Sequence, residues 1–327
     1  MYGVRIRFAD GHDLAFEVAP EQTVLEAAMQ IDAPLRYDCA SGSCGACIAQ
    51  VAEGETIFAP DGPSPISLAE AQAGLRPTCQ TRLASAAVFD LPYALYPQPS
   101  AASRHGTLVR GVERVSASVF RLSLERPEEF SFQAGQYVRL RPPGARSARA
   151  YSISSAPDDA SQLEFLIREV PGGMVSTWLA QSAGAGDRVT IQGPLGAFAF
   201  DGRSRDHVFI VGGTGLAPAL SMLRDMGEAR ATLCFGVNSE ADLFLEQELS
   251  ALAANGHEVR MAVNGGEPGP GRTLGTAVSL LRPGDVAPGR AYYLCGPPPM
   301  VEAARESLMA QGVAANLIRS ERYLPSE

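Results

Sequence analysis

The fold of the amino-terminal segment follows from one stretch of sequence, Cys39-Ala40-Ser41-Gly42-Ser43-Cys44-Gly45-Ala46-Cys47. Three cysteines stand in a C-x4-C-x2-C arrangement, and every residue between them is small. Such a loop can wrap closely around a compact inorganic core, because no bulky side chain intervenes and glycine tolerates positive φ. A fourth cysteine, Cys79, follows an expected short helix at residues 67–72, where we expect a strand to return.

The spacing of these four cysteines is the ligand pattern of a plant-type [2Fe-2S] cluster. A structural zinc site usually uses two paired C-x2-C units, and only one is present here. Two disulfides would need an oxidising compartment, which nothing in the sequence indicates. The pattern therefore favours Cys39, Cys44, Cys47 and Cys79 as cluster ligands, and it predicts electron transfer.

Length, composition and charge fit a modular enzyme. The 327 residues, 46% of them hydrophobic, suffice for two or three domains with real cores. The amino terminus has no apolar signal region and no apolar run could span a bilayer, so we expect a cytoplasmic protein that binds no membrane. Residues 1–95 hold twelve acidic residues and five arginines, a net −7 of the chain's −9. This charge argues against nucleic acid and favours docking on a basic partner surface, although an acidic face that only aids solubility explains it equally well.

The first domain is expected to be a β-grasp ferredoxin over residues 1–95. Alternating apolar residues at 4–8 and 14–18, around the turn Asp10-Gly11, predict a hairpin. Helical spacing follows at residues 23–29, with Thr23 as N-cap and Glu26 as its capping-box partner. Residues 96–105 have the proline-rich and small polar composition of a linker.

The rest of the chain changes pattern twice. Short strands at 106–112, 119–124, 137–140, 163–167 and 188–191 predict an antiparallel β-barrel over residues 106–202. Residues 203–327 alternate strands at 207–211, 231–237, 259–263 and 291–295 with helices from 216, at 243–254 and from 298. That alternation predicts a doubly wound parallel sheet, so the chain is expected to be a multidomain α+β and α/β protein.

Four motifs in these two segments carry chemistry: Arg149-Ala150-Tyr151-Ser152, Pro171-Gly172-Gly173-Met174-Val175-Ser176, Gly212-Gly213-Thr214-Gly215-Leu216-Ala217-Pro218 and Cys295-Gly296-Pro297-Pro298. The first supplies an arginine, an aromatic ring and a hydroxyl, which suit the phosphate, the ring system and the N5 region of a flavin. The second and third bring backbone N–H groups to a helix start, where they can bind phosphate. Each motif taken alone is also compatible with an ordinary strand or turn.

In this order the motifs resemble the ferredoxin–NADP⁺ reductase superfamily, and with the amino-terminal cysteine loop the whole chain resembles oxygenase reductases of the benzoate dioxygenase reductase type. The resemblance implies FAD rather than FMN, held by Arg149, Ala150, Tyr151, Ser152, Ile167, Gly172, Gly173, Met174, Val175 and Ser176. It implies NADH binding at Gly212, Gly213, Thr214, Gly215, Cys295, Gly296 and Pro297. It also implies catalytic roles for Ser152, Cys295, Glu321 and Tyr323, although the last two are equally compatible with a solvated tail.

The choice of nicotinamide follows from charge near the second strand of the last domain. Residues 236–244 carry two acids and no arginine, which favours NADH over the 2′-phosphate of NADPH. The alternative is that Arg230, Arg260 or Arg272 reaches this site from another loop.

The resemblance implies a Rieske-type ring-hydroxylating oxygenase of aromatic catabolism as the protein partner, which would receive single electrons from the acidic ferredoxin domain. A diiron monooxygenase, a sugar-deoxygenation system or a redox-sensing role are the alternatives. The four histidines lie at no metal-binding spacing, and no Ser-His-Asp pattern or Walker loop appears, so hydrolysis and phosphoryl transfer have no support.

Overall fold

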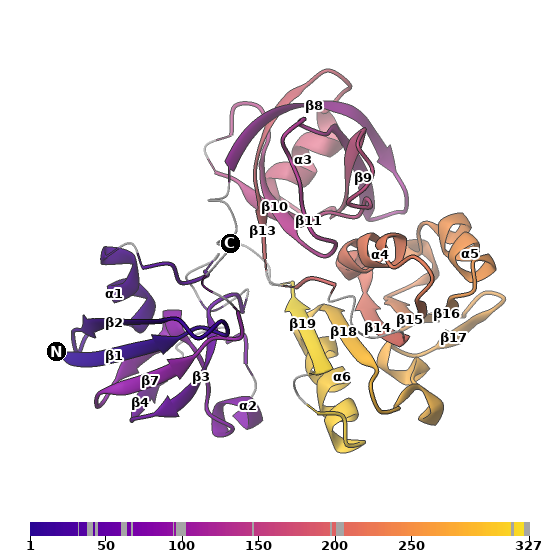
Figure 1. The fold of residues 1–327 in the computed structure, drawn as a ribbon. Coiled ribbons are helices and arrows are strands. Elements are labelled where there is room, and N and C mark those ends of the chain that lie inside the picture. Colours follow the sequence, from indigo (N-terminus) through magenta and orange to yellow (C-terminus); the bar gives the residue numbers. More distant parts are fainter. Residues whose placement is uncertain are drawn as a thin grey trace. The chain divides into compact units, whose positions relative to one another are not determined.

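The computed structural model describes residues 1–31, 33–37, 42, 45–59, 64–66, 68–93, 95, 103–145, 147–196, 198–200, 206–314 and 317–323. The chain divides into two compact units, residues 1–101 and 102–327, drawn in Figure 1. Of the expected linker, residues 96–102 lie outside the described residues, and residues 103–105 already belong to a strand of the second unit.

The first unit is a mixed sheet packed on one main helix. Its sheet has the order β2-β1-β7-β3-β5, with β1 and β7 parallel and the other pairs antiparallel. The strands are β1 (Tyr2–Arg7), β2 (Asp13–Val18), β3 (Ile48–Glu53), β5 (Leu75–Pro77) and β7 (Ala87–Asp90), and β4 (Thr56–Phe58) pairs separately with β6 (Thr81–Leu83). This is the expected β-grasp fold, and the expected hairpin is β1 and β2.

Helix α1 (Val24–Gln30) begins as its sequence predicted. The Glu26 backbone N–H donates to Thr23 Oγ1 across 3.2 Å, and the Thr23 N–H donates to Glu26 Oε2 across 2.8 Å. The reciprocal pair satisfies two N–H groups that a helix start leaves without partners. Val24 and Ala28 on the inner face of α1 pack against Ile6 and Phe89 of the sheet.

A strand returns after the expected helix, but it ends before Cys79, which lies in a short 3-10 turn. Helix α2 (Leu68–Gln72) and strand β5 precede it, and the turn covers Thr78–Gln80 before β6 begins. The Thr78 N–H donates to the Cys47 carbonyl across 3.0 Å, and the Thr81 hydroxyl donates to the Pro77 carbonyl across 2.7 Å. These two bonds fold the chain back at Cys79, which explains why an extended conformation is not found there.

The second unit begins with a closed antiparallel barrel. Its strands are β8 (Ser103–Arg114), β9 (Val119–Glu125), β10 (Tyr137–Arg141), β11 (Arg149–Ser152), β12 (Gln162–Arg168) and β13 (Arg188–Leu195), in the order β11-β10-β13-β8-β9-β12. A bridge between Ile153 and Phe165 joins the two edges, so the sheet closes on itself. Helix α3 (Met174–Gln181) packs on the barrel core through Val175 and Leu179.

The carboxyl-terminal part is the expected doubly wound sheet, with all strands parallel. Its order is β17-β16-β15-β14-β18-β19, from β14 (Asp206–Gly212), β15 (Arg230–Val237), β16 (Glu258–Val263), β17 (Arg272–Leu274), β18 (Ala291–Gly296) and β19 (Ile318–Arg322). Strands β17 and β19 were not predicted. The helices are α4 (Leu216–Asp225), α5 (Glu246–Ala254) and α6 (Pro298–Ala310); α5 begins three residues later than expected, because Leu245 is left-handed with φ 58°.

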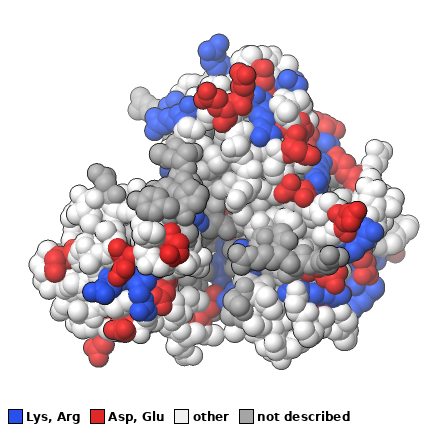
Figure 2. Space-filling model, viewed as in Figure 1, with Lys and Arg blue, Asp and Glu red and all other residues white. Residues whose placement is uncertain are grey.

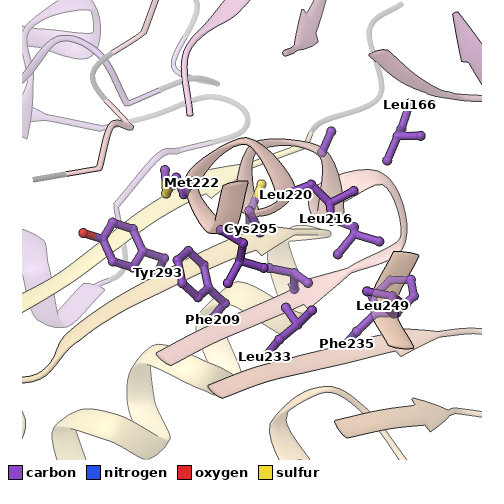
Figure 3. Close-up of a cluster of buried hydrophobic side chains, with 14 of the residues drawn as sticks. Leu166, Phe209, Leu216, Leu220, Met222, Leu233, Phe235, Leu249, Tyr293 and Cys295 are labelled. Carbon is purple, nitrogen blue, oxygen red and sulfur yellow. The ribbon is translucent and has the colours of Figure 1, made fainter. Parts of the chain in front are cut away.

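Alternate residues of these strands face two different cores. Phe209, Phe235 and Tyr293 pack against α4 and α5, as Figure 3 shows, whereas Ile210 and Leu294 pack with α6 on the other side. Val119, Ala134 and Leu166 of the barrel join the first of these cores. The barrel and the parallel sheet therefore share one hydrophobic cluster, which explains why they form a single compact unit. Within the described part of the chain, no helix is long and apolar enough to cross a membrane.

Candidate active site and cofactor-binding residues

The carboxyl ends of β14 and β18 lie side by side at the centre of the parallel sheet, where ligands of doubly wound folds bind. The turn Gly213–Gly215 leads from β14 into α4. A Cβ atom at Gly215 would overlap the Cys295 carbonyl group, so only glycine allows the turn to approach β18 this closely. The predicted nucleotide residues of both motifs are thus brought to one edge of the sheet.

Strand β19 brings the chain's last candidate residues to the same edge. Its parallel pairing with β18 places Glu321 opposite Cys295, and the Tyr323 N–H donates to the Gly296 carbonyl across 2.9 Å. The segment is therefore a strand of the sheet and not a solvated tail. Sequence reasoning missed the strand, because Ile318 is its one buried residue and no apolar alternation marks it.

The four residues predicted to be catalytic form one hydrogen-bonded cluster, which we call the Ser152–Tyr323 cluster. The Tyr323 hydroxyl donates to Ser152 Oγ across 2.8 Å, and the Ser152 hydroxyl donates to Glu321 Oε2 across 3.3 Å. The Cys295 thiol points at the same carboxylate oxygen from 3.9 Å. The cluster thus joins the end of barrel strand β11 to strands β18 and β19.

Burial keeps two members of this cluster in their neutral form. Cys295 is fully buried, and burial, reinforced by the Glu321 charge, raises the pKa of its thiol well above the ordinary value. Burial also raises the pKa of the Tyr323 hydroxyl well above its ordinary value, with Cys295 and Glu321 adding to the shift. At neutral pH both groups therefore keep their protons and act as hydrogen-bond donors.

Strand β11 displays the first predicted flavin motif. Arg149 and Tyr151 share one face of the strand and are half-buried, Ala150 is exposed, and Ser152 is buried on the other face. The Tyr151 ring packs against the barrel core, and burial raises the pKa of its hydroxyl to about 12. The Arg149 guanidinium contacts the Ala148 carbonyl at 3.2 Å and Ser147 Oγ at 3.4 Å. A ring and a cation on one accessible face fit the ring and phosphate of FAD.

The predicted phosphate loop is shaped by Ser176, whose hydroxyl lies inside the loop. Ser176 Oγ accepts from the Val170 N–H across 3.2 Å and lies 3.1 Å from the Val170 carbonyl oxygen. A Cβ at Gly173 would lie 2.7 Å from Ser176 Oγ and 3.0 Å from the Val170 carbonyl oxygen, so any larger residue would force this loop to shift. The N–H groups of the first turn of α3, which have no partner within the helix, then remain to bind phosphate. Gly172, with φ +72°, precedes this turn.

Ile167 and Val175, like Ser176, are buried and do not offer their side chains to a ligand. Ile167 and Val175 are buried in the barrel core, where they pack with Leu122 and Phe165. Any contact that they make with FAD must therefore use the main chain. Met174, by contrast, is half-buried, and its sulfur lies 3.7 Å from Ser147 Oγ, next to Arg149.

The predicted cluster ligands Cys47 and Cys79 meet in the first unit. Their sulfur atoms lie 3.3 Å apart, too far for a disulfide bond of about 2.05 Å. The Thr78-to-Cys47 backbone hydrogen bond holds the two cysteines together. Two converging cysteine sulfurs fit part of a [2Fe-2S] ligand set. Cys39 and Cys44 lie outside the described residues.

A set of polar contacts between barrel and parallel sheet had no counterpart in the sequence reasoning. Arg224 of α4 contacts Glu164 of β12 at 3.0 Å and Glu248 of α5 at 2.7 Å, and Glu248 also binds Arg121 of β9 at 2.7 Å. The Ser118 hydroxyl donates to Asp242 across 2.6 Å. No local sequence pattern predicts these contacts, because the two residues of each pair are more than 20 positions apart in the chain.

Comparison with protein families assigns the three parts of the chain separately. Residues 8–84 match the 2Fe-2S iron-sulfur cluster binding domain, residues 108–200 the oxidoreductase FAD-binding domain, and residues 209–306 the oxidoreductase NAD-binding domain. The fold and the site thus define a modular iron-sulfur flavoprotein oxidoreductase.

Individual relatives match almost the whole chain. The toluate 1,2-dioxygenase electron transfer component of Pseudomonas putida is 33% identical over 98% of this chain and 97% of its own length. The alkene monooxygenase ferredoxin–NAD(+) reductase component of Xanthobacter autotrophicus is 34% identical over 97% of this chain and 98% of its own. The crystal structure of the Amycolatopsis cytochrome P450 reductase GcoB superposes with a TM-score of 0.70 at 29% identity, covering 99% of both chains.

The chain belongs to the family of these electron transfer components, in which a ferredoxin domain is joined to FAD- and NAD-binding oxidoreductase domains. It is an NADH oxidoreductase whose cofactors are a [2Fe-2S] cluster and FAD.

Proposed function

We propose that this chain oxidises NADH and delivers the electrons one at a time to a Rieske-type ring-hydroxylating oxygenase in the cytoplasm. When bound, FAD would supply an acceptor for the electron pair of NADH, and the [2Fe-2S] cluster would supply a one-electron carrier. The observation that carries the proposal is the Ser152–Tyr323 cluster, in which a flavin-domain hydroxyl and a nucleotide-domain thiol meet in one buried site. The similarity to the toluate 1,2-dioxygenase component supports this choice of partner.

Different residues of the chain bind the nucleotide and FAD. The Gly212–Gly215 turn and the Cys295-Gly296-Pro297 segment bind the nucleotide at the carboxyl edge of the sheet, and Arg149, Ala150, Tyr151 and the loop from Gly172 to Ser176 hold FAD. Ser152 offers its hydroxyl where barrel and sheet meet, and Glu321 and Tyr323 fix its orientation. Cys295 contributes bulk without charge, since its thiol stays protonated. Cys295 and Tyr323 are therefore neutral at neutral pH, and Glu321 is the acidic member of the cluster.

The first unit would donate the electrons to the partner protein. Cys39, Cys44, Cys47 and Cys79 would hold the cluster, and exposed acids of this unit would meet a basic surface on the oxygenase. The exposed acids include Asp10, Asp13, Glu17, Glu21, Glu26, Glu53 and Glu55. Figure 2 shows that arginines are interspersed with acids on the visible face of this unit, so the attraction comes from its net charge and not from one uniform patch.

A monooxygenase is the second candidate partner, because the alkene monooxygenase component is as similar to this chain as the toluate component is. The two partners differ only in what docks on the ferredoxin unit. Stopped-flow mixing of the reduced protein with a Rieske oxygenase or with a diiron component separates them, since only the true partner is reduced at a rate that falls steeply with salt.

The relay order is tested with Cys79→Ser. NADH oxidation with ferricyanide, which takes electrons from the flavin, should continue at the wild-type rate, whereas reduction of cytochrome c should be abolished. Cys234→Ser, which alters a buried cysteine of the parallel sheet, is the control and should lose neither activity selectively. Equal loss of both activities in Cys79→Ser would contradict the proposed function.

A further inference from the structure

Of the three arginines that could bring positive charge to the nucleotide site, only one reaches the relevant edge. Arg230 is the first residue of β15, at the amino end of the sheet, where it donates to the Asn255 carbonyl across 2.9 Å. The Arg260 guanidinium is bound to Asp285 on the side of the sheet that packs with α6. Arg272, at the start of β17 next to β16 (Figure 1), reaches the loop that follows β15.

Arg272 is held there by two carboxylates. Its Nη1 lies 3.2 Å from Glu240 Oε2, and its Nη2 contacts Glu246 at the start of α5. Glu240 also accepts a hydrogen bond from the Gly269 N–H across 2.6 Å, which fixes the loop before β17. The Arg272 side chain is 13% exposed, against 35% for Glu240 and 52% for Glu246. The cation is thus covered, and the two acids face the solvent.

The second acid of the 236–244 segment is engaged elsewhere. Asp242 accepts from Ser118 across 2.6 Å and from Ser239 across 2.8 Å, and these hydroxyls lower the pKa of its carboxyl. Of the two acids of this segment, Glu240 is therefore the one that pairs with Arg272. The group of Glu240, Arg272 and Glu246, which we call the acid–arginine triad, carries a net charge of −1.

A nucleotide with a 2′-phosphate brings about two negative charges to the end of the second strand, where the ribose binds. A site of net charge −1 repels it, whereas a ribose hydroxyl can donate to a carboxylate at no electrostatic cost. Arg272 would otherwise be a suitable phosphate ligand, because guanidinium groups bind phosphate in a bidentate manner. Here the two nitrogens needed for that geometry are occupied by Glu240 and Glu246.

We propose that the acid–arginine triad sets the preference for NADH, and that Arg272 is a latent 2′-phosphate ligand which Glu240 and Glu246 keep neutralised. This inference rests on the proposed function, since it assumes that nucleotide binds at this edge. Removing both acids reverses the local charge to +1 and frees the guanidinium. Removing a nearby acid that does not contact Arg272 leaves the guanidinium bound to Glu240 and Glu246.

The test is calorimetric titration of the FAD-loaded protein with adenosine 5′-monophosphate and with adenosine 2′,5′-bisphosphate. Glu240→Gln/Glu246→Gln should bind the bisphosphate at least about tenfold more tightly than wild type, and each single variant should gain less. Glu267→Gln, an exposed acid in the loop between β16 and β17, is the matched control and should gain less than about threefold. Adding Arg272→Gln to the double variant should remove the gain.

The outcomes separate the two proposals. No gain in the double variant, an equal gain in Glu267→Gln, or a gain that survives Arg272→Gln would each overturn the role of the triad while the proposed function stands. Failure of wild type to bind adenosine 5′-monophosphate and NADH would instead contradict the nucleotide site itself. The ratio of kcat/KM for NADPH and NADH provides a second readout and should rise by a similar factor in the double variant.

Discussion

The hydroxyl of Tyr323 donates a hydrogen bond to the hydroxyl of Ser152 across 2.8 Å, although the two residues are 171 positions apart in the chain. Ser152 ends barrel strand β11, and Tyr323 follows directly after β19 of the parallel sheet. The bond therefore spans the two halves of the second unit at the place where hydride transfer is proposed. Its length depends on both domains keeping their positions, so it ties the geometry of the site to the packing of the unit.

Ser152→Ala should slow flavin reduction while leaving the fold intact. The substitution removes the donor to Glu321 and takes away the acceptor of the Tyr323 hydroxyl. We expect the rate of flavin reduction by NADH in stopped-flow experiments to fall about ten- to a hundredfold, as for a lost hydrogen bond of about 1.5–3 kcal/mol to a charged group.

Ser221→Ala is the matched control for this experiment. Ser221 is also a buried serine that joins the two halves, through a 2.7 Å bond to the Ser155 carbonyl, but it lies outside the Ser152–Tyr323 cluster. It should lower the melting temperature slightly without slowing flavin reduction. A normal rate in Ser152→Ala would remove Ser152 from the catalytic site.

Gly173→Ala should weaken FAD binding. The added Cβ would meet Ser176 Oγ at 2.7 Å and the Val170 carbonyl oxygen at 3.0 Å, so the loop before α3 must open. The first-turn N–H groups then lose the position in which they can bind phosphate. We expect FAD to dissociate on gel filtration, with a Kd raised at least about tenfold. Gly184→Ala, in a loop where a Cβ meets nothing within 4 Å, should retain FAD like wild type.

Alkaline pH should destabilise the second unit through Cys234. Burial raises the pKa of this thiol from an ordinary 9.0 to about 12, so the folded protein keeps a proton that the unfolded chain releases above pH 9. The stabilisation is complete below pH 9 and is lost as the pH rises from 9 to 12, by up to about 1.4 kcal/mol per pH unit. Melting temperatures of wild type should therefore fall more steeply over this range than those of Cys234→Ala. If the melting temperatures of the two proteins fall equally with pH, Cys234 is not a cause of the alkaline destabilisation.

The parts of the fold that depend on local patterns were predictable from the sequence. The capping pair Thr23 and Glu26 predicted the start of α1, and the apolar run before Gly212 predicted β14 and the turn that follows it. Strand β19 was not predictable, because its only buried residue is Ile318 and its position in the sheet is set by its pairing with β18. The 3-10 turn at Cys79 was likewise hidden, since its shape depends on the Cys47 carbonyl from a distant strand.

The candidate site also has features that the sequence predicted and features that it did not. Ser152, Cys295, Glu321 and Tyr323 were singled out by resemblance to a family, and the structure brings all four together. The sequence left open which arginine approaches the nucleotide edge, because the answer depends on the pairing of β17 with β16. It also gave no sign that the Ser176 hydroxyl is used inside its own loop. Both are properties of tertiary contacts and not of any short motif.

Asp285 should be among the most costly single residues to remove. Its carboxylate receives the Arg260 guanidinium at 2.5 and 3.0 Å and the Arg282 N–H at 2.6 Å, and both side chains of the ion pair are less than a tenth exposed. Asp285→Ala leaves the buried Arg260 guanidinium with only the more exposed Glu258 as a carboxylate partner, so we expect a loss of about 3 kcal/mol. Asp90→Ala breaks a similar two-bond pair with Arg7 in the first unit, but that pair is nearly half exposed and screened by solvent, so its loss should cost far less. Urea unfolding followed by fluorescence should separate the two variants clearly; equal midpoints would show that burial does not control the strength of these pairs.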